Sequence, residues 1–293
     1  MRIFDTHTHL VTDDFANYPL IEPGAPGGHT GVPANPAGVN LRERITAAPL
    51  TAEAVLALWS EAGVAGGVAV QYRTAYGVDN SYLLDSAARH PDQIRPVIVV
   101  DAAGAETPGR LRSLAGRHRL AGIRITGGMT PAGEFPWLDS EDALATLAEA
   151  DRLGLPIVIM SVPPGTNEAA LRRIGGVADR LPGAQIVIDH VGWPVDGYHL
   201  RSAHAELADR PNINVKVTTE NFDQVAEANA RPSGFLRRAV DLFGADRVMW
   251  GSDYGNAPGS YADLLGRALD AVTELTDAEQ DAVLGGTGRR LFG

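Results

Sequence analysis

The feature of this sequence that most constrains its fold is an alternation of short apolar segments with longer amphipathic ones. The apolar segments, rich in β-forming residues, span residues 3–6, 67–70, 95–100, 122–126, 156–160, 185–189, 213–217 and 247–250. Strands that alternate with helices predict a parallel sheet with helices on its faces. Periodicity alone does not separate an open doubly wound sheet from a closed barrel. A count of eight strands favours an α/β fold of the (β/α)8 TIM-barrel type.

Helix start signals lie between these segments. Thr51 precedes Ala-Glu and is a predicted N-cap, and Ser140 precedes Glu-Asp in the same way. A third helix is predicted to begin at Ser233. Thr276 and Glu279 have the spacing of a capping box, in which each side chain bonds the other residue's backbone N–H. The segments between the strands are therefore predicted to be helical.

The chain has 293 residues, of which 44% are hydrophobic, and can bury a substantial core. Length alone also allows two smaller domains, but we expect one barrel domain over residues 1–293. Residues 11–49 form a connection rich in Gly, Pro and Asn, far longer than the roughly 2–6 residues usual between a strand and its helix. A variable surface loop is one interpretation. A lid or pocket wall is preferred, because the loop after the first strand lies on the catalytic face of a barrel.

Charge and composition exclude several classes of function. A net charge of −11 argues against nucleic acid and against an anionic membrane, which both need a basic surface. The absence of cysteine excludes disulfides and thiolate nucleophiles, so any metal must be held by His, Asp or Glu. No signal-like or membrane-spanning apolar segment is evident, so a cytoplasmic protein is expected. The expected partner is a small molecule, and a homo-oligomer remains open.

Polar residues collect at the carboxyl ends of the predicted strands. They comprise His7 and His9 after the first, Tyr72 and Arg73 after the second, Arg124 in the fourth, Asp189 and His190 after the sixth, Lys216 in the seventh and Asp253 after the eighth. In a parallel barrel all these ends meet at one mouth. Burying so many polar groups is costly unless that mouth is a polar site. The pattern therefore predicts an active or binding site there.

His7 and His9 are two residues apart on a strand, so both side chains face the same side. Two imidazoles on one side suit a divalent ion, with zinc preferred. Asp253 is a candidate ligand, a candidate general base that takes a proton from an attacking water, or both. The alternatives are a turn or N-cap role for Asp253 and a core histidine for His190.

Arg124 lies inside an apolar strand, where its charge requires an anionic partner. That partner is either a carboxylate of the protein or a carboxylate of the substrate. Lys216 poses the same question, and Tyr72 and Arg73 are candidate pocket residues. Five further histidines in predicted loops or helices are expected to be solvated, with only the first able to reach the pocket: His29, His90, His118, His199 and His204.

Three motifs give the chain a family resemblance: DTHTHL at 5–10, IDHVGWP at 188–194 and MWGSDY at 249–254. They resemble the strand 1, 6 and 8 signatures of the amidohydrolase-2 family of the amidohydrolase superfamily. YGVDNSY at 76–82 and RLFG at 290–293 are similar to further landmarks, so the resemblance covers nearly the whole chain. The most similar branch is that of sugar lactonases and 2-pyrone-4,6-dicarboxylate lactonase.

The resemblance implies a (β/α)8 barrel that hydrolyses a lactone or similar ester. His7, His9, His190 and Asp253 match the family's metal-binding or catalytic positions, and Arg124 matches an arginine that binds substrate in some members. Two features depart from the family pattern: the fifth predicted strand has no histidine after it, and the fourth has no lysine. One divalent metal is therefore the expected maximum, and catalysis without a metal remains open.

Three functions follow from these residues. The preferred one is hydrolysis of a lactone that carries a carboxylate or hydroxyls, with Asp253 as base, His190 orienting or stabilising the developing oxyanion, and Arg124 anchoring the substrate's anionic end. The alternative is metal-dependent, non-oxidative decarboxylation of an aromatic or unsaturated acid, which the missing strand 5 histidine disfavours. The third is a barrel that binds a ligand without turning it over.

Overall fold

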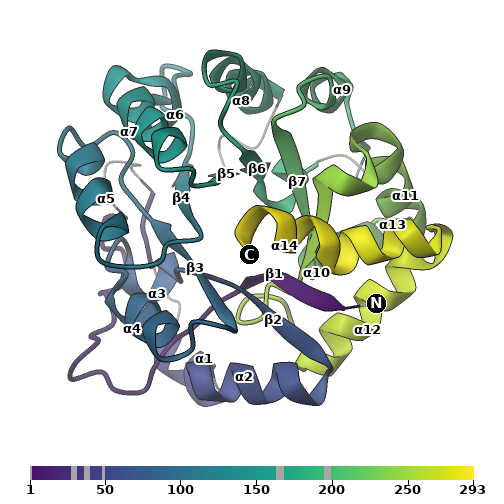
Figure 1. Cartoon of the computed structure of the whole chain (residues 1–293), viewed down its shortest axis with the longest axis horizontal. Coiled ribbons are helices and arrows are strands. Elements are labelled where there is room, and N and C mark those ends of the chain that lie inside the picture. Colours follow the sequence, from purple (N-terminus) through teal and green to yellow (C-terminus); the bar gives the residue numbers. More distant parts are fainter. Residues whose placement is uncertain (1, 28–31, 36–39, 48–49, 163–167, 195–198) are drawn as a thin grey trace.

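The computed structural model describes residues 2–27, 32–35, 40–47, 50–162, 168–194 and 199–293. Its eight strands pair in parallel in the order of the sequence, with helices around them (Figure 1). The strands are β1 (Ile3–Thr8), β2 (Val64–Val70), β3 (Ile94–Val99), β4 (Gly122–Gly127), β5 (Ile157–Ser161), β6 (Ile186–Ile188), β7 (Ile213–Thr218) and β8 (Val248–Gly251). The predicted (β/α)8 barrel is confirmed.

The barrel closes between β8 and β1, largely through the segment that follows β8. The Thr6 hydroxyl donates to the Trp250 carbonyl at 2.6 Å. The backbone N–H of Asp253 donates to the His7 carbonyl at 2.8 Å, and that of His9 donates to the Tyr254 carbonyl at 3.1 Å. The peptide that carries Asp253 therefore joins the last strand to the first.

The helices are α1 (Leu41–Ala47), α2 (Ala52–Glu61), α3 (Arg73–Tyr76), α4 (Ser81–Arg89), α5 (Thr107–Ala115), α6 (Pro136–Asp139), α7 (Glu141–Arg152), α8 (Glu168–Arg180), α9 (Ser202–Ala208), α10 (Thr219–Glu227), α11 (Pro232–Phe243), α12 (Tyr261–Ala271), α13 (Asp277–Asp281) and α14 (Thr287–Phe292). Thr51 and Ser140 cap α2 and α7 as predicted, each accepting a backbone N–H at 3.2 Å. The capping box of Thr276 and Glu279 is present. The start predicted at Ser233 is wrong by one residue, because Pro232 occupies the first helical position.

The core has two parts, one inside the barrel and one between the strands and the surrounding helices. The inner part includes Val68, Val97, Val158 and Val187 from the strands and Phe292 from α14. Figure 1 shows α14 lying across the centre of the ring of strands. Because side chains alternate along a strand, the inward positions beyond these valines are free to carry polar groups at the mouth. No helix within the described ranges is long and apolar enough to span a membrane.

Candidate active site

His7, His9 and Asp253 meet at the mouth of the barrel, as the sequence predicts. The Nε2 atom of His9 lies 3.3 Å from Asp253 Oδ1, and the Nε2 atom of His7 lies 3.6 Å from the same oxygen. All three side chains are at most 2% exposed. Gly251 admits His7 to this position, because a Cβ on Gly251 would collide with the Cβ of His7.

The second ring nitrogen of His9 fixes its tautomer. His9 Nδ1 lies 2.9 Å from the carbonyl oxygen of Val70. A carbonyl only accepts hydrogen bonds, so Nδ1 carries a proton, and in the neutral tautomer Nε2 is the atom that presents a lone pair toward Asp253. The His9 ring also stacks on Tyr72, with ring centroids 4.6 Å apart. Both contacts hold the ring in one orientation, as second-sphere partners of metal-binding histidines do.

His190 approaches the same cavity from a turn after β6. The structure ends β6 at Ile188, so Asp189 lies just outside the strand predicted for 185–189 and begins a 3-10 turn. His190 has a φ of 54°, in the left-handed region. Asn221 stabilises this conformation by donating its side-chain N–H to the His190 carbonyl at 3.1 Å. His204 contributes from α9, with Nε2 3.0 Å from the Val191 carbonyl.

His204 is therefore buried within the fold, and the expectation that it is solvated is wrong. His90 and His118 are half-buried and His199 is exposed. His29 lies outside the described residues.

A chain of hydrogen bonds also sets the tautomer of His190. Its Nδ1 lies 2.8 Å from the Thr218 hydroxyl oxygen, and that hydroxyl donates to the side-chain carbonyl of Asn221 at 3.3 Å. Because the single hydroxyl proton goes to Asn221, the Thr218 oxygen accepts from His190 Nδ1. Nε2 of neutral His190 is then the unprotonated nitrogen.

Burial keeps these imidazoles neutral. Desolvation, followed by the repulsion of Lys216, lowers the pKa of His7 to about 3, and desolvation lowers the pKa of His190 to about 4. Burial alone would raise the pKa of Asp253, but the positive charge that the neighbouring histidines, His7 first, carry when protonated holds that pKa well below its usual range. At neutral pH the Asp253 carboxylate therefore lies beside the uncharged imidazoles of His7 and His190.

This donor set fits a divalent metal ion. His7 Nε2 and His9 Nε2 are buried and have no hydrogen-bond partner among the described residues. With Asp253, their ligand atoms lie within 4.8 Å of one another. The edges of a zinc tetrahedron with bonds of about 2.0–2.1 Å are roughly 3.3–3.4 Å long, close to the nitrogen–oxygen separations found here. The three side chains can thus hold one ion with little rearrangement.

Arg124 and Lys216 both find their anionic partner in Asp189. The Arg124 Nε–H and the Lys216 ammonium each lie 2.8 Å from a different Asp189 oxygen, and all three side chains are at most 5% exposed. His7 Nδ1 is 3.6 Å from the same carboxylate. Asp189 was placed at the end of the sixth strand by the sequence analysis, but no role was predicted for it. The signal for it was the need of two buried cations for a carboxylate, together with its position beside His190.

Tyr72 and Arg73 lie at different depths. The Tyr72 hydroxyl donates to Asn256 at 3.0 Å, and Asn256 donates to Asp253 Oδ1 at 3.2 Å, so Tyr72 borders the site. The guanidinium of Arg73 donates to the carbonyls of Pro33 and Gly27 in the 11–49 connection. Substrate contacts of Arg73 remain a prediction, and its observed role is to bind that connection to the barrel.

The sequence analysis missed Glu220, in the first turn of α10. Burial, and then the charge of Asp253, raise the pKa of Glu220 to about 8. Gln224 donates to its carboxyl group at 3.4 Å. Glu220, His190 and Asp253 have ligand atoms within 4.8 Å of one another. A carboxyl group in the first turn of a helix is common for structural reasons alone, so no signal in the sequence distinguished Glu220.

The end of the 11–49 connection borders the mouth. Arg44, on α1, donates to the Gly255 carbonyl, and its guanidinium lies over the ring of Tyr72, 5.8 Å from the centroid. These contacts join the connection to residues that touch His9 and Asp253. They support the interpretation as a pocket wall, which remains a prediction.

Comparison with protein families identifies a match: the amidohydrolase family model matches residues 4–293. The chain belongs to the amidohydrolase family. L-fucono-1,5-lactonase of Burkholderia ambifaria is 30% identical to it over 188 residues, which are 60% of each chain. The match thus spans less than two thirds of that relative. Its activity supports the resemblance to the lactonase branch.

Solved structures share the fold along the whole chain. A probable 2-pyrone-4,6-dicarboxylic acid hydrolase of Acinetobacter baumannii, with citric acid bound, has a TM-score of 0.69 at 18% identity and full coverage of both chains. A Burkholderia multivorans amidohydrolase with bound zinc has a TM-score of 0.70 at 20% identity, covering 100% of this chain and 99% of its own. Decarboxylases also have this fold. At these identities the similarity establishes the fold and does not choose between reactions.

Proposed function

We propose that this amidohydrolase is a hydrolase that opens a lactone, or similar cyclic ester, of a small substrate carrying a carboxylate or hydroxyls. The observation that carries the proposal is the arrangement of imidazoles around an ionised carboxylate. His9 and His190 are fixed in tautomers whose free nitrogen is Nε2, and His9 directs that nitrogen at Asp253. Lone pairs facing a carboxylate repel it unless a cation lies between them.

That cation is proposed to be one divalent metal, with zinc preferred, held by His7, His9 and Asp253. A metal bound there would polarise the ester carbonyl and lower the pKa of an attacking water. The zinc in the Burkholderia multivorans structure supports this choice.

The chain's own residues then have separate tasks. Asp253 takes the proton of the attacking water on its carboxylate, where Oδ1 already faces His7 and His9. His190 orients that water through Nε2, since neutral His190 in this tautomer accepts a hydrogen bond there and does not donate one. A role of His190 as oxyanion donor would require its protonation, which the low pKa opposes. The orienting role is therefore the one we retain.

Arg124 is proposed to anchor the anionic or hydroxylated end of the substrate. Its Nε–H is committed to Asp189, and Nη2 contacts the sulfur of Met160, a weak acceptor. A substrate oxygen is a better partner for that edge of the guanidinium. Lys216 binds the other Asp189 oxygen deep in the barrel, so we assign it to positioning Asp189 rather than to the substrate.

The test is a panel of sugar lactones and pyrone carboxylates, assayed with and without a chelator in the wild type and Asp253→Asn. Asn keeps the shape of Asp and tolerates the φ of 55° at this position. We expect loss of about 10²–10⁴-fold in turnover on removal of the base, with an unchanged circular dichroism spectrum. Asp209→Asn, an exposed aspartate with the same charge change, is the matched control. Full activity of Asp253→Asn would remove the proposed base.

The same panel should include aromatic and unsaturated acids, with release of CO₂ measured. Decarboxylation without lactone hydrolysis would replace the proposed reaction by the alternative. Saturable binding with neither reaction would identify a ligand-binding barrel instead.

A further inference from the structure

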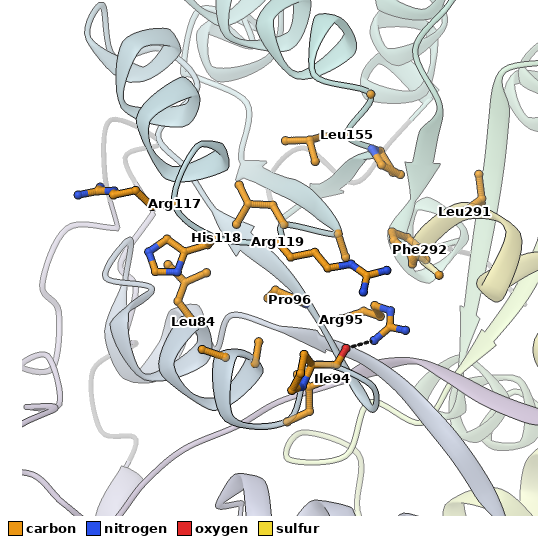
Figure 2. A pocket seen from close by; sticks show the side chains of 18 residues that line it. Leu84, Ile94, Arg95, Pro96, Arg117, His118, Arg119, Leu155, Leu291 and Phe292 are labelled. Atoms are coloured by element: carbon orange, nitrogen blue, oxygen red, sulfur yellow. Dashed lines mark hydrogen bonds between the residues drawn. The ribbon is translucent and has the colours of Figure 1, made fainter.

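A second hollow lies at the opposite end of the barrel from the histidines. It has a volume of about 250 Å³ and is lined by the amino-terminal ends of β3, β4 and β5, the end of α4 and the last residues of α14 (Figure 2). Leu84, Pro96, Leu155 and Phe292 form an apolar wall. The hollow is thus separated from the mouth by the inner core of the barrel.

The charged side chains that line this hollow are all basic. They are Arg95, Arg117 and Arg119, accompanied by His118; among the described residues no Asp or Glu side chain lines the hollow, although the terminal residue Gly293 does. The chain as a whole carries a net charge of −11, so a basic hollow departs from the general surface. Such a local reversal of charge attracts anions.

Arg95 and Arg119 are the centre of this hollow. Figure 2 shows both guanidinium groups pointing into the same part of it, beside Phe292. Burial, and then the positive charge of Arg119, lower the pKa of Arg95. Within the described ranges no carboxylate forms an ion pair with either arginine, although the charge of Asp92 partly offsets that of Arg119 on Arg95. Two like charges therefore approach each other without a directly paired carboxylate.

The hydrogen bonding of Arg95 is also incomplete. Its Nη1 donates to the Pro91 carbonyl at 2.6 Å, which fixes the side chain. Its Nε is buried and has no hydrogen-bond partner among the described residues. A buried donor without a partner costs free energy that a bound acceptor would recover. Arg95 is thus positioned by the backbone while one donor stays available.

We propose that this hollow is a binding site for a small organic oxyanion, a carboxylate or a phosphate monoester with a short apolar part. The anionic oxygens would bind between Arg95 and Arg119, since a guanidinium pairs well with two oxygens of one group. The apolar part would contact Leu155 and Phe292. This site is separate from the proposed reaction and does not depend on it.

Binding is tested by isothermal titration calorimetry of the purified full chain with phosphate, butyl phosphate and butyrate, using chloride at equal ionic strength as reference. We expect saturable binding of at least one oxyanion. Arg95→Gln and Arg119→Gln should each weaken it by about tenfold, the loss of one charged hydrogen bond. Comparison of the affinities for the phosphate ester and for the carboxylate identifies which class of anion the hollow binds.

Arg180→Gln is the matched control, because Arg180 is exposed on α8, away from the hollow. It should bind the anion as the wild type does. Circular dichroism and thermal unfolding establish that each variant is folded. The proposal is overturned if the wild type shows no saturable binding. It is also overturned if Arg95→Gln and Arg119→Gln both bind the anion as tightly as the wild type. The second result would place the anion at the mouth, near Arg124.

Discussion

The two ends of the barrel hold opposite kinds of like-charge pair. At the mouth, Glu220 faces Asp253, while the buried cations Arg124 and Lys216 share the carboxylate of Asp189. At the other end, Arg95 and Arg119 approach each other with no carboxylate between them. A pair of acids attracts a proton or a metal, and a pair of arginines attracts an anion. One chain can therefore present two sites of opposite selectivity on the same set of strands.

The largest expected effect is on stability and follows from Asp189→Asn. This change leaves the buried cations Arg124 and Lys216 without the carboxylate they share, and breaking a buried ion pair costs about 3–5 kcal/mol. Urea unfolding measures the loss. Arg95→Gln at the other end should change the free energy of unfolding by less than about 1 kcal/mol, because it breaks no ion pair. Equal losses of stability in both variants would contradict the proposed difference between the two ends.

The double variant Asp189→Asn with Lys216→Met checks the cause. It leaves one buried cation without a partner, Arg124, instead of two, so the double variant should be more stable than Asp189→Asn alone. If it is less stable, packing rather than charge explains the first result.

The next effect concerns metal affinity. His9→Ala removes a proposed ligand that Val70 holds in place, and zinc affinity should fall by more than the roughly 100-fold that loss of a second-sphere partner costs. Competition with a zinc-sensitive dye measures it. Anion binding at Arg95 should not change, and Arg95→Gln should bind zinc normally. A variant that alters both ligands would show that the two ends are coupled.

Glu220→Gln tests the acid pair through pH. The pKa of Glu220 is raised from 4.5 to about 8, so its carboxyl group is neutral in the folded protein where the unfolded chain ionises it. This contribution to stability is present below pH 4.5 and is lost as the pH rises through about 8. Metal-free wild type should therefore lose of the order of 1 kcal/mol relative to Glu220→Gln between about pH 5 and pH 8. A constant difference would contradict the pairing.

The smallest expected effect is that of Arg44→Ala, which removes the contact of α1 with Tyr72 and Gly255. An exposed cation–π contact contributes about 0.5–1 kcal/mol. If the 11–49 connection is a pocket wall, KM for the lactone should rise about two- to fivefold with little change in kcat. Arg42→Ala, whose guanidinium lies over Phe15 in the same connection, is the control. Equal kinetics in all three proteins would make this segment a surface loop.

The strands and the four residues that meet at the mouth could be predicted because each depends on local signals. Apolar runs mark the strands, and in a parallel barrel the strand ends must meet, so His7, His9, His190 and Asp253 had to converge. Pairings across the barrel could not be predicted in the same way. Arg124 needed a carboxylate, but its identity as Asp189 depends on the turn that follows β6 and on Lys216 reaching the same group.

The join between β8 and β1 has a consequence for motion. Asp253 and His9 bind the facing strand through their own backbone N–H groups. Fluctuations that displace Asp253 must therefore break the ring of strands itself. Hydrogen exchange at these two amides should be as slow as at the strand interiors. The protein would have to hold its reactive groups still and admit the substrate by moving other segments.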